Sequence, residues 1–234
     1  ERARAAAPFL VLAPAAIWIA TSADAFFAGV ACWGVALVVL ATGRDGLRAD
    51  ALALAGGLLL GAALMLSYGL VLIWVVPAVI AIARRRLRTL AVAALGPVIV
   101  LGGFALGGFW WFDGYSASRN AHNAGIAATR PYGFFFVDDL AAFAVALGPA
   151  VCVGLAGLRE HGERLMVGAA LAAVLLADLT GLSKGEVERI WLPFAPLVML
   201  GAAGLPRERG ATRAWLAGAG LFAAFVEVLV RTAW

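Results

Sequence analysis

Long apolar runs alternate with short polar connections along the whole chain. Nine apolar segments can be marked, at about 5–20, 25–41, 51–66, 70–83, 89–111, 134–158, 165–179, 190–205 and 214–234. A helix needs roughly 20 residues to cross the hydrocarbon core of a bilayer; most runs suit this length, and the first and fourth are short. The runs lack the period-2 alternation of barrel strands, and only helices or closed barrels satisfy their backbone in lipid. The pattern therefore predicts an all-α bundle of about nine membrane helices, forming one domain over 1–234.

Composition supports a membrane protein and excludes one other class. The mean hydropathy is +0.96, and 14% of the residues are charged, whereas about a quarter are charged in soluble domains. The basic pI of about 9.7 could suggest a nucleic-acid partner. That interpretation needs a cationic face on a folded surface, but here the arginines form short clusters between apolar runs. We expect a bilayer and no nucleic acid.

The basic residues predict the orientation. With the amino end in the cytoplasm, thirteen of the eighteen basic residues fall in cytoplasmic connections. They are Arg2, Arg4, Arg44, Arg48, Arg84, Arg85, Arg86, Arg88, Arg159, Arg164, Arg207, Arg209 and Arg213. The outer face receives only Arg119, Arg130, Lys184, Arg189 and Arg231. This bias follows the positive-inside rule and predicts a multi-pass protein of the cell membrane.

The predicted outer face also collects the acids. It holds Asp24, Asp113, Asp138, Asp139, Asp178, Glu186 and Glu188, together with His122. Its one long connection is expected to run from Trp111 to Asp139, so any chemistry is expected on this side. Cys32 and Cys152 fall in the middle of apolar runs with no partner at metal-ligand spacing, which argues against a disulfide or a zinc site.

The stretch 184–189 holds the only lysine of the chain and crowds Lys184, Glu186, Glu188 and Arg189 into six residues. A helix start accounts for part of it, because Ser183 three residues before Glu186 forms a capping box and Lys184 would lie one turn before Glu188. This account does not explain Glu188 and Arg189, which lie directly before the apolar run that begins at Ile190. Ionisable groups at membrane depth usually face protein or a water-filled cavity, so a functional interpretation is favoured.

The run 184–193 resembles the basic-Gly-Glu-x-x-Arg-hydrophobic segment found late in bacterial and archaeal members of the GT-C superfamily, multi-pass glycosyltransferases related to the protein O-mannosyltransferases. The run 21–27 is similar to the Ser/Pro-x-Asp-Ala-hydrophobic start of an early helix in that family. Arg130-Pro131-Tyr132 resembles the end of its long outer loop. The three pieces occur along this chain in the same order as in the family, which strengthens the resemblance.

The resemblance implies transfer of a sugar from a polyprenyl-phosphate carrier to an acceptor hydroxyl on the extracytoplasmic face. Such a transfer needs a carboxylate near the acceptor and cations for the departing phosphate. The implied roles are Asp24 as base helper or metal ligand, Lys184, Arg189 and Arg130 for phosphate, Glu186 and Glu188 to orient these cations, and His122 and Tyr132 for the acceptor or sugar. A divalent metal ion is left open as a cofactor. The four residues Asp24, Arg130, Lys184 and Arg189 are then expected to converge.

The sequence departs from the family in one respect. The principal catalytic acid of the family usually lies in a large first outer loop, and this sequence has no such loop. Because the chain begins with Glu1 rather than Met, we expect a fragment of a longer membrane protein whose catalytic base lies outside it.

Several outer residues also have structural interpretations. His122 could simply be solvated, and Asp138 and Asp139 would open a helix and complement its dipole. Asp178 and Glu227 could pair with Arg189 or Arg231. The aromatic residues Trp110, Trp111, Tyr115 and Tyr132 suit a membrane interface.

Two rival functions remain open. A transporter or lipid flippase also places charges inside a helical bundle, but it predicts inverted repeats and broken helices. Neither is evident in the sequence, although Pro97 and Pro193 could kink their helices. A noncatalytic scaffold is favoured if the outer charges face water singly.

Overall fold

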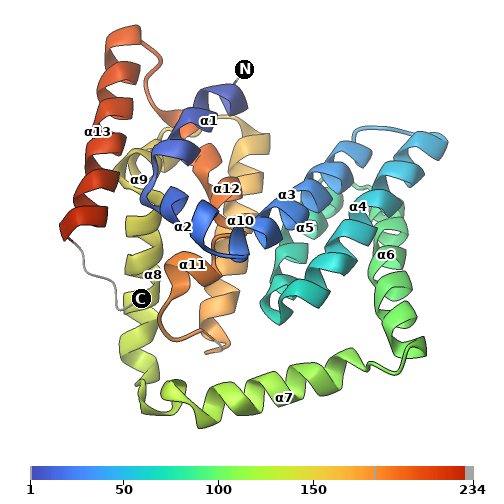
Figure 1. The fold of residues 1–234 in the computed structure, drawn as a ribbon. Coiled ribbons are helices and arrows are strands. Elements are labelled where there is room, and N and C mark those ends of the chain that lie inside the picture. The colour runs from blue at the N-terminus through green and yellow to red at the C-terminus, as the bar shows by residue number, and fades with distance from the viewer. Residues whose placement is uncertain (1, 182, 230–234) are drawn as a thin grey trace.

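The computed structural model describes residues 2–181 and 183–229, and these ranges are helical with no strand (Figure 1). The predicted all-α fold is therefore confirmed. The elements in chain order are α1 Arg2–Leu12, η1 Pro14–Ala16, α2 Ile17–Thr21, α3 Asp24–Ala41, α4 Gly46–Leu66, η2 Tyr68–Trp74, α5 Val75–Ala83, α6 Leu87–Leu106, α7 Trp111–Ala124, η3 Ile126–Thr129, α8 Tyr132–Leu147, α9 Pro149–Ala156, α10 His161–Leu179, α11 Val187–Ile190, α12 Ala195–Val198, η4 Met199–Gly204 and α13 Arg209–Leu229.

Four of these helices, α3, α4, α6 and α13, are long and apolar enough to cross a membrane. A fifth span results if α8 and α9 count as one, although the pair is bent by 96°. The other apolar segments are present as shorter or interrupted helices. The count of nine membrane helices therefore stays a prediction.

Proline and glycine explain several of the interruptions, because proline cannot donate a helical hydrogen bond. Pro14 opens the 3-10 turn between α1 and α2, and Gly148 adopts φ 82° just before Pro149 opens α9. Pro193 lies in the turn between α11 and α12, whereas α6 continues through Pro97. The structure thus contains broken helices, of which the sequence indicated only the one at Pro193.

Small residues let α3, α4 and α6 approach closely. A Cβ atom at Gly57 of α4 would collide with the backbone of Ala93 in α6, and one at Gly96 would collide with the backbone of Gly57. Gly34 of α3 faces Gly56 of α4 in the same way. Such glycine contacts are typical of helices that pack within a bilayer. They hold α3, α4 and α6 as one group.

Helix α7 connects this group to the rest of the bundle. In Figure 1 it runs along one end of the molecule from the end of α6 to the start of α8, far from the turn between α3 and α4. Trp111 at its start donates its indole N–H to the carbonyl oxygen of Leu64 at 2.9 Å. Helix α10 contacts η2 and α5 and joins the two parts of the molecule above α7.

Two expectations about the segment 111–139 are wrong. It is not a loop, because α7, η3 and the first half of α8 occupy it. Asp138 and Asp139 do not open a helix, since α8 begins at Tyr132 and has no acid in its first turn. The run from Tyr132 to Val137 is strongly apolar and extends the helix by almost two turns toward its amino end. Asp139 consequently lies on the inner face of α8 and is 1% exposed.

Connections predicted to share a side of the membrane contact each other. Arg86 pairs with Asp45 at 2.5 Å and Arg88 pairs with Asp50 at 2.7 Å, which joins two predicted cytoplasmic turns. On the other side, the rings of Tyr68 and Trp111 meet edge to face with centroids 5.0 Å apart. These contacts agree with the prediction that successive connections lie on alternate sides of the membrane. Which end faces the cytoplasm stays a prediction.

Candidate functional site

Arg189 joins two carboxylates that are far apart in the sequence. Its Nη1 donates to Asp24 Oδ2 at 3.1 Å, and its Nη2 donates to Glu186 Oε2 at 3.0 Å. Asp24 lies at the start of α3, 165 positions before Arg189. The Ser22 hydroxyl also donates to Asp24 Oδ2 at 3.0 Å. We call Asp24, Glu186 and Arg189 the ion cluster; the expected convergence of Asp24 and Arg189 is confirmed.

The turn before α11 does not start as the sequence predicts. Helix α11 begins at Val187, and its N-cap residue is Glu186 with φ 62° and no side-chain capping bond. The predicted capping box from Ser183 to Glu186 is therefore wrong, and Lys184 does not share a helix with Glu188. Gly181 and Gly185 also have positive φ, at 62° and 86°. Glycine adopts this conformation freely, but at Glu186 the side chain makes it unfavourable.

The peptide group between Lys184 and Gly185 is held at both ends. Arg130 Nη1 donates to the carbonyl oxygen of Lys184, and the Gly185 N–H donates to Asp139 Oδ1 at 2.8 Å. The Arg130 guanidinium also lies over the ring of Phe135, with 5.3 Å to the ring centroid. Arg130 and Lys184 thus meet within the stretch that carries Arg189, but the contact of Arg130 is with the backbone. Convergence of all four predicted side chains on one site stays a prediction.

The ion cluster is partly shielded from water. The Asp24 side chain is 14% exposed and that of Arg189 is 38% exposed. Burial by itself would lower the pKa of Arg189, but the hydrogen bond to Glu186 and the charge of Asp24 raise it above its usual value. Burial also raises the pKa of Glu188, and the charge of Glu186 adds to this effect. The arginine is therefore a permanent cation among three carboxylates.

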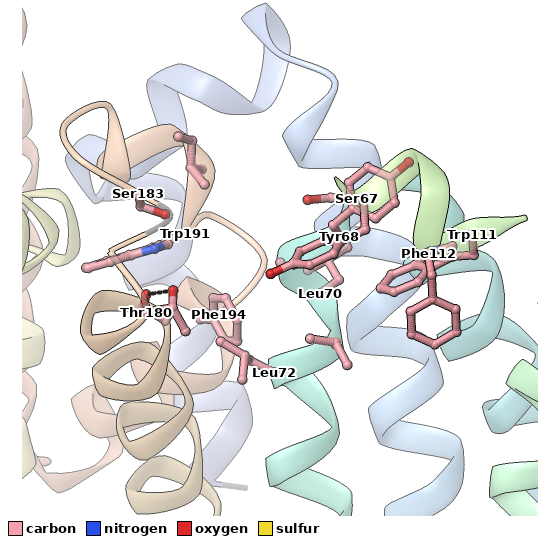
Figure 2. A pocket seen from close by; sticks show the side chains of 15 residues that line it. Ser67, Tyr68, Leu70, Leu72, Trp111, Phe112, Thr180, Ser183, Trp191 and Phe194 are labelled. Atoms are coloured by element: carbon pink, nitrogen blue, oxygen red, sulfur yellow. Dashed lines mark hydrogen bonds between the residues drawn. The ribbon is translucent and has the colours of Figure 1, made fainter. Parts of the chain in front are cut away.

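A cavity of about 210 Å³ reaches the residues that follow Arg189. Figure 2 shows it between the turn at Ser67–Leu72 and the α10–α12 region. Its aromatic walls are Tyr68, Trp111, Phe112, Tyr115, Trp191 and Phe194, and its hydroxyl groups come from Ser67, Tyr68, Tyr115, Thr180 and Ser183. Flat aromatic faces with a few hydroxyls suit an amphiphilic ligand with an apolar chain or ring.

Some aromatic residues face the cavity rather than a membrane interface. Trp111 is buried and stacks on Tyr115, with ring planes 2° apart and centroids 5.8 Å apart. Trp191 is 1% exposed, and its indole nitrogen has no hydrogen-bond partner in the described part of the chain. Trp110, in contrast, is exposed, as expected of an interface aromatic. Trp111, Tyr115 and Trp191 therefore belong to the cavity wall, and the Trp191 indole N–H is a buried donor without a partner among the described residues.

Two other carboxylates are buried near this region. Asp139 of α8 and Asp178 of α10 are each 1% exposed, and each has one oxygen without a hydrogen-bond partner among the described residues. The proposed pairing of Asp178 with Arg189 is wrong, because the ion pairs of Arg189 go to Asp24 and Glu186. Arg231, the other suggested partner of Asp178 and Glu227, lies outside the described residues.

Other predicted residues lie around the site rather than in it. Tyr132 donates its hydroxyl to the carbonyl oxygen of Leu179 at 3.3 Å, which ties the start of α8 to the end of α10. His122 lies in the last turn of α7 and is neither part of the cavity lining nor bonded to the ion cluster. Within 2–181 and 183–229, no three His, Cys, Asp or Glu side chains are placed to hold a metal ion. The sugar-contact roles and the metal stay predictions.

Asp139 was not predicted from the sequence to be part of this site. An acid on an apolar helix, four residues before the buried Phe143, is a recognisable sign of an inward-facing carboxylate. The side chain of Phe143 packs edge to face on Trp191 at 5.7 Å between centroids. Tyr68 and Trp191 were also not predicted, because the local sequence does not distinguish a residue that lines a cavity from one in the packed core.

Comparison with known proteins adds no assignment. No protein-family model, curated protein or solved structure matches the chain. The site itself therefore carries any functional conclusion.

Proposed function

We propose that the protein is a membrane glycosyltransferase that moves a sugar from a polyprenyl-phosphate carrier to an acceptor hydroxyl on the extracytoplasmic face. The proposal includes the nine-helix topology with a cytoplasmic amino end. In the reaction, the acceptor oxygen bonds to the anomeric carbon while a base takes its proton. The bond from that carbon to the phosphate oxygen breaks, and the phosphate leaves on the lipid.

The observation that carries this proposal is the ion cluster. An arginine with an ion pair to an acid 165 positions away is difficult to explain as a topology signal, because topology arginines act in short connections. Guanidinium groups bind phosphate oxygens in a bidentate manner, and a partly shielded arginine is suited to a charged group at a membrane surface. Glu186 fits the orienting role, since it bonds directly to Arg189.

The cavity supports the same proposal. It continues from Ile190 and Trp191, which directly follow the proposed phosphate ligand. A polyprenyl-phosphate sugar has an apolar chain and a polar head joined at the phosphate, so its two parts need neighbouring apolar and charged surfaces. Lys184 and Arg189 are assigned to the phosphate, Asp24 remains the base helper or metal ligand, and Arg130 keeps a phosphate role only alongside its bond to the backbone.

The proposal is tested with the purified full-length protein in lipid nanodiscs. Binding of a polyprenyl phosphate is followed by tryptophan fluorescence, and transfer is followed by release of labelled sugar from the carrier. Arg189→Lys keeps the charge but loses the bidentate geometry, so we expect transfer to fall about a hundredfold, as for loss of one charge-stabilising donor. The matched control is Arg86→Lys, which alters an exposed ion pair elsewhere. Undiminished transfer by Arg189→Lys would overturn the phosphate assignment.

A lipid flippase is the second candidate, and the broken helices favour it. The 96° bend between α8 and α9 is a feature that this class predicts. The two candidates differ in bond chemistry, since a flippase moves the carrier between leaflets with its sugar still attached. Movement of an intact labelled donor across proteoliposomes, without release of sugar, would favour the flippase.

A further inference from the structure

The amino-terminal half of α8 holds one peptide group of the turn 181–186. The carbonyl of Lys184 accepts from Arg130, and the N–H of Gly185 donates to Asp139 at 2.8 Å. These two groups belong to the same peptide unit, so its plane is fixed from both ends. Arg130 lies two residues before the start of α8, and Asp139 follows nine positions later on the buried face of the helix.

The backbone on either side of this peptide requires such support. Gly185 has φ 86°, and a Cβ at this position would meet Arg130 Nη1 at 2.7 Å. Glu186 follows with φ 62°, a left-handed conformation that is unfavourable for a residue with a side chain. A strained residue persists only where surrounding contacts hold it. The left-handed conformation of Glu186 in turn directs its carboxylate to Arg189.

We propose that Asp139 and Arg130 act as a peptide clamp that positions Glu186 and Arg189. The clamp comprises the Arg130 guanidinium, the Lys184–Gly185 peptide and the Asp139 carboxylate. Asp139 is a positioning residue, because it acts through the turn and does not touch the ion cluster. A hydrogen bond to a carboxylate is stronger than one between neutral groups, and burial of Asp139 keeps water from competing for the Gly185 N–H.

The clamp has a test that does not depend on enzymatic activity. In a Cys32→Ala, Cys152→Ala background, Ser183→Cys reports the turn through its rate of modification by a soluble maleimide. Asp139→Leu removes the acceptor and keeps the branched shape of the side chain, so we expect labelling at least several times faster than in the parent. Asp139→Asn retains Oδ1 as an acceptor and should label like the parent. The adjacent Asp138→Leu is the matched control, since Asp138 is exposed, and should also label like the parent.

A second measurement connects the peptide clamp to the proposed phosphate site. Only this measurement rests on the proposed function. For polyprenyl phosphate, Asp139→Leu should weaken apparent affinity about tenfold, the order of one charged hydrogen bond, and Asp139→Asn should restore it. If Asp139→Leu does not fold, Arg130→Met opens the same clamp from its carbonyl side and is expected to speed labelling likewise.

The outcomes separate the two ideas. A folded Asp139→Leu protein that labels at the parent rate would overturn the clamp. Faster labelling, together with no binding of polyprenyl phosphate by any variant including the parent, would leave the clamp standing and contradict the proposed function.

Discussion

Two turns of this protein contain similar residues and use them differently. The turn 84–88 carries four arginines, and the turn 181–189 carries Lys184 and Arg189 between acids. Each contains one residue other than glycine with positive φ, Arg85 at 55° and Glu186 at 62°. Since both residues have the same unfavourable backbone conformation, the two turns must differ in the contacts that stabilise it.

At Arg85 the local helix end is sufficient. The Arg86 N–H donates to Ala81 at 2.7 Å and the Arg85 N–H donates to Ile82 at 2.9 Å. This is the hydrogen-bond pattern of a Schellman cap, in which a left-handed residue follows the last helical turn. The neighbouring ion pair of Arg86 is open to water, with its Asp45 side chain 81% exposed. The turn needs no distant partner.

At Glu186 the strain precedes a helix, where no such cap applies. Its support comes from Asp139 of α8 through Gly185 and from the bond to Arg189, which is itself held by Asp24 of α3. Two elements distant in sequence, α3 and α8, therefore help to maintain one turn. The comparison indicates that the turn 84–88 ends a helix and marks a membrane side, whereas the turn 181–189 presents a site.

The largest expected effect concerns the sides of the membrane. In a background without Cys32 and Cys152, Arg86→Cys should resist an impermeant thiol reagent in intact cells, and Ser118→Cys in α7 should react. The reason is the positive-inside distribution of the arginines. Both variants should react after the cells are permeabilised. Labelling of position 86 in intact cells would reverse the topology.

Removal of the arginine should affect stability more at the ion cluster than at the exposed turn. Arg189→Ala leaves two carboxylates without their cation; because the arginine is 38% exposed, we expect a loss of about 1–2 kcal/mol, below that of a fully buried pair. Arg86→Ala should lose about 0–1 kcal/mol, as for a surface pair. Thermal unfolding in detergent compares them, and equal losses would remove the energetic distinction between the turns.

Glycine substitution should separate strain from ion pairing. Arg85→Gly relieves the left-handed backbone and should raise stability by about 0.5–1 kcal/mol. Glu186→Gly relieves the same strain but loses the bond to Arg189, so its net stability should change by less, while binding of polyprenyl phosphate weakens. Thermal unfolding and fluorescence titration of both variants check this. If Glu186→Gly is clearly more stable than the parent and binds polyprenyl phosphate equally well, Glu186 does not orient Arg189.

The smallest effect is a pH dependence from Glu188. Because burial raises its pKa in the folded state, folding favours the protonated form. Its contribution to stability is present below the ordinary value of 4.5 and is lost as pH rises through the folded value. Glu188→Gln should remove this component and be slightly more stable than the parent at neutral pH. Parallel melting-temperature profiles against pH in the two proteins would contradict this assignment.

The sequence predicted those parts of the fold that depend on local composition. Apolar runs long enough for a bilayer became α3, α4, α6 and α13, since a backbone in lipid must form helices. The segment 111–139 was misjudged as a loop because polar residues fill much of its first half between two apolar runs. Its amino end is held instead by Trp111, whose bond to Leu64 cannot be inferred from local sequence.

The candidate site shows the same division. Residue type and hydropathy are enough to show that Asp24, Lys184, Glu186 and Arg189 are chargeable groups beside apolar runs. The packing of the helices makes Arg189 pair with Asp24 rather than Asp178, and it turns Asp139 inward to hold Gly185. These choices depend on how α3, α8 and α11 pack, and on backbone angles that are set by contacts between elements rather than by any one of them.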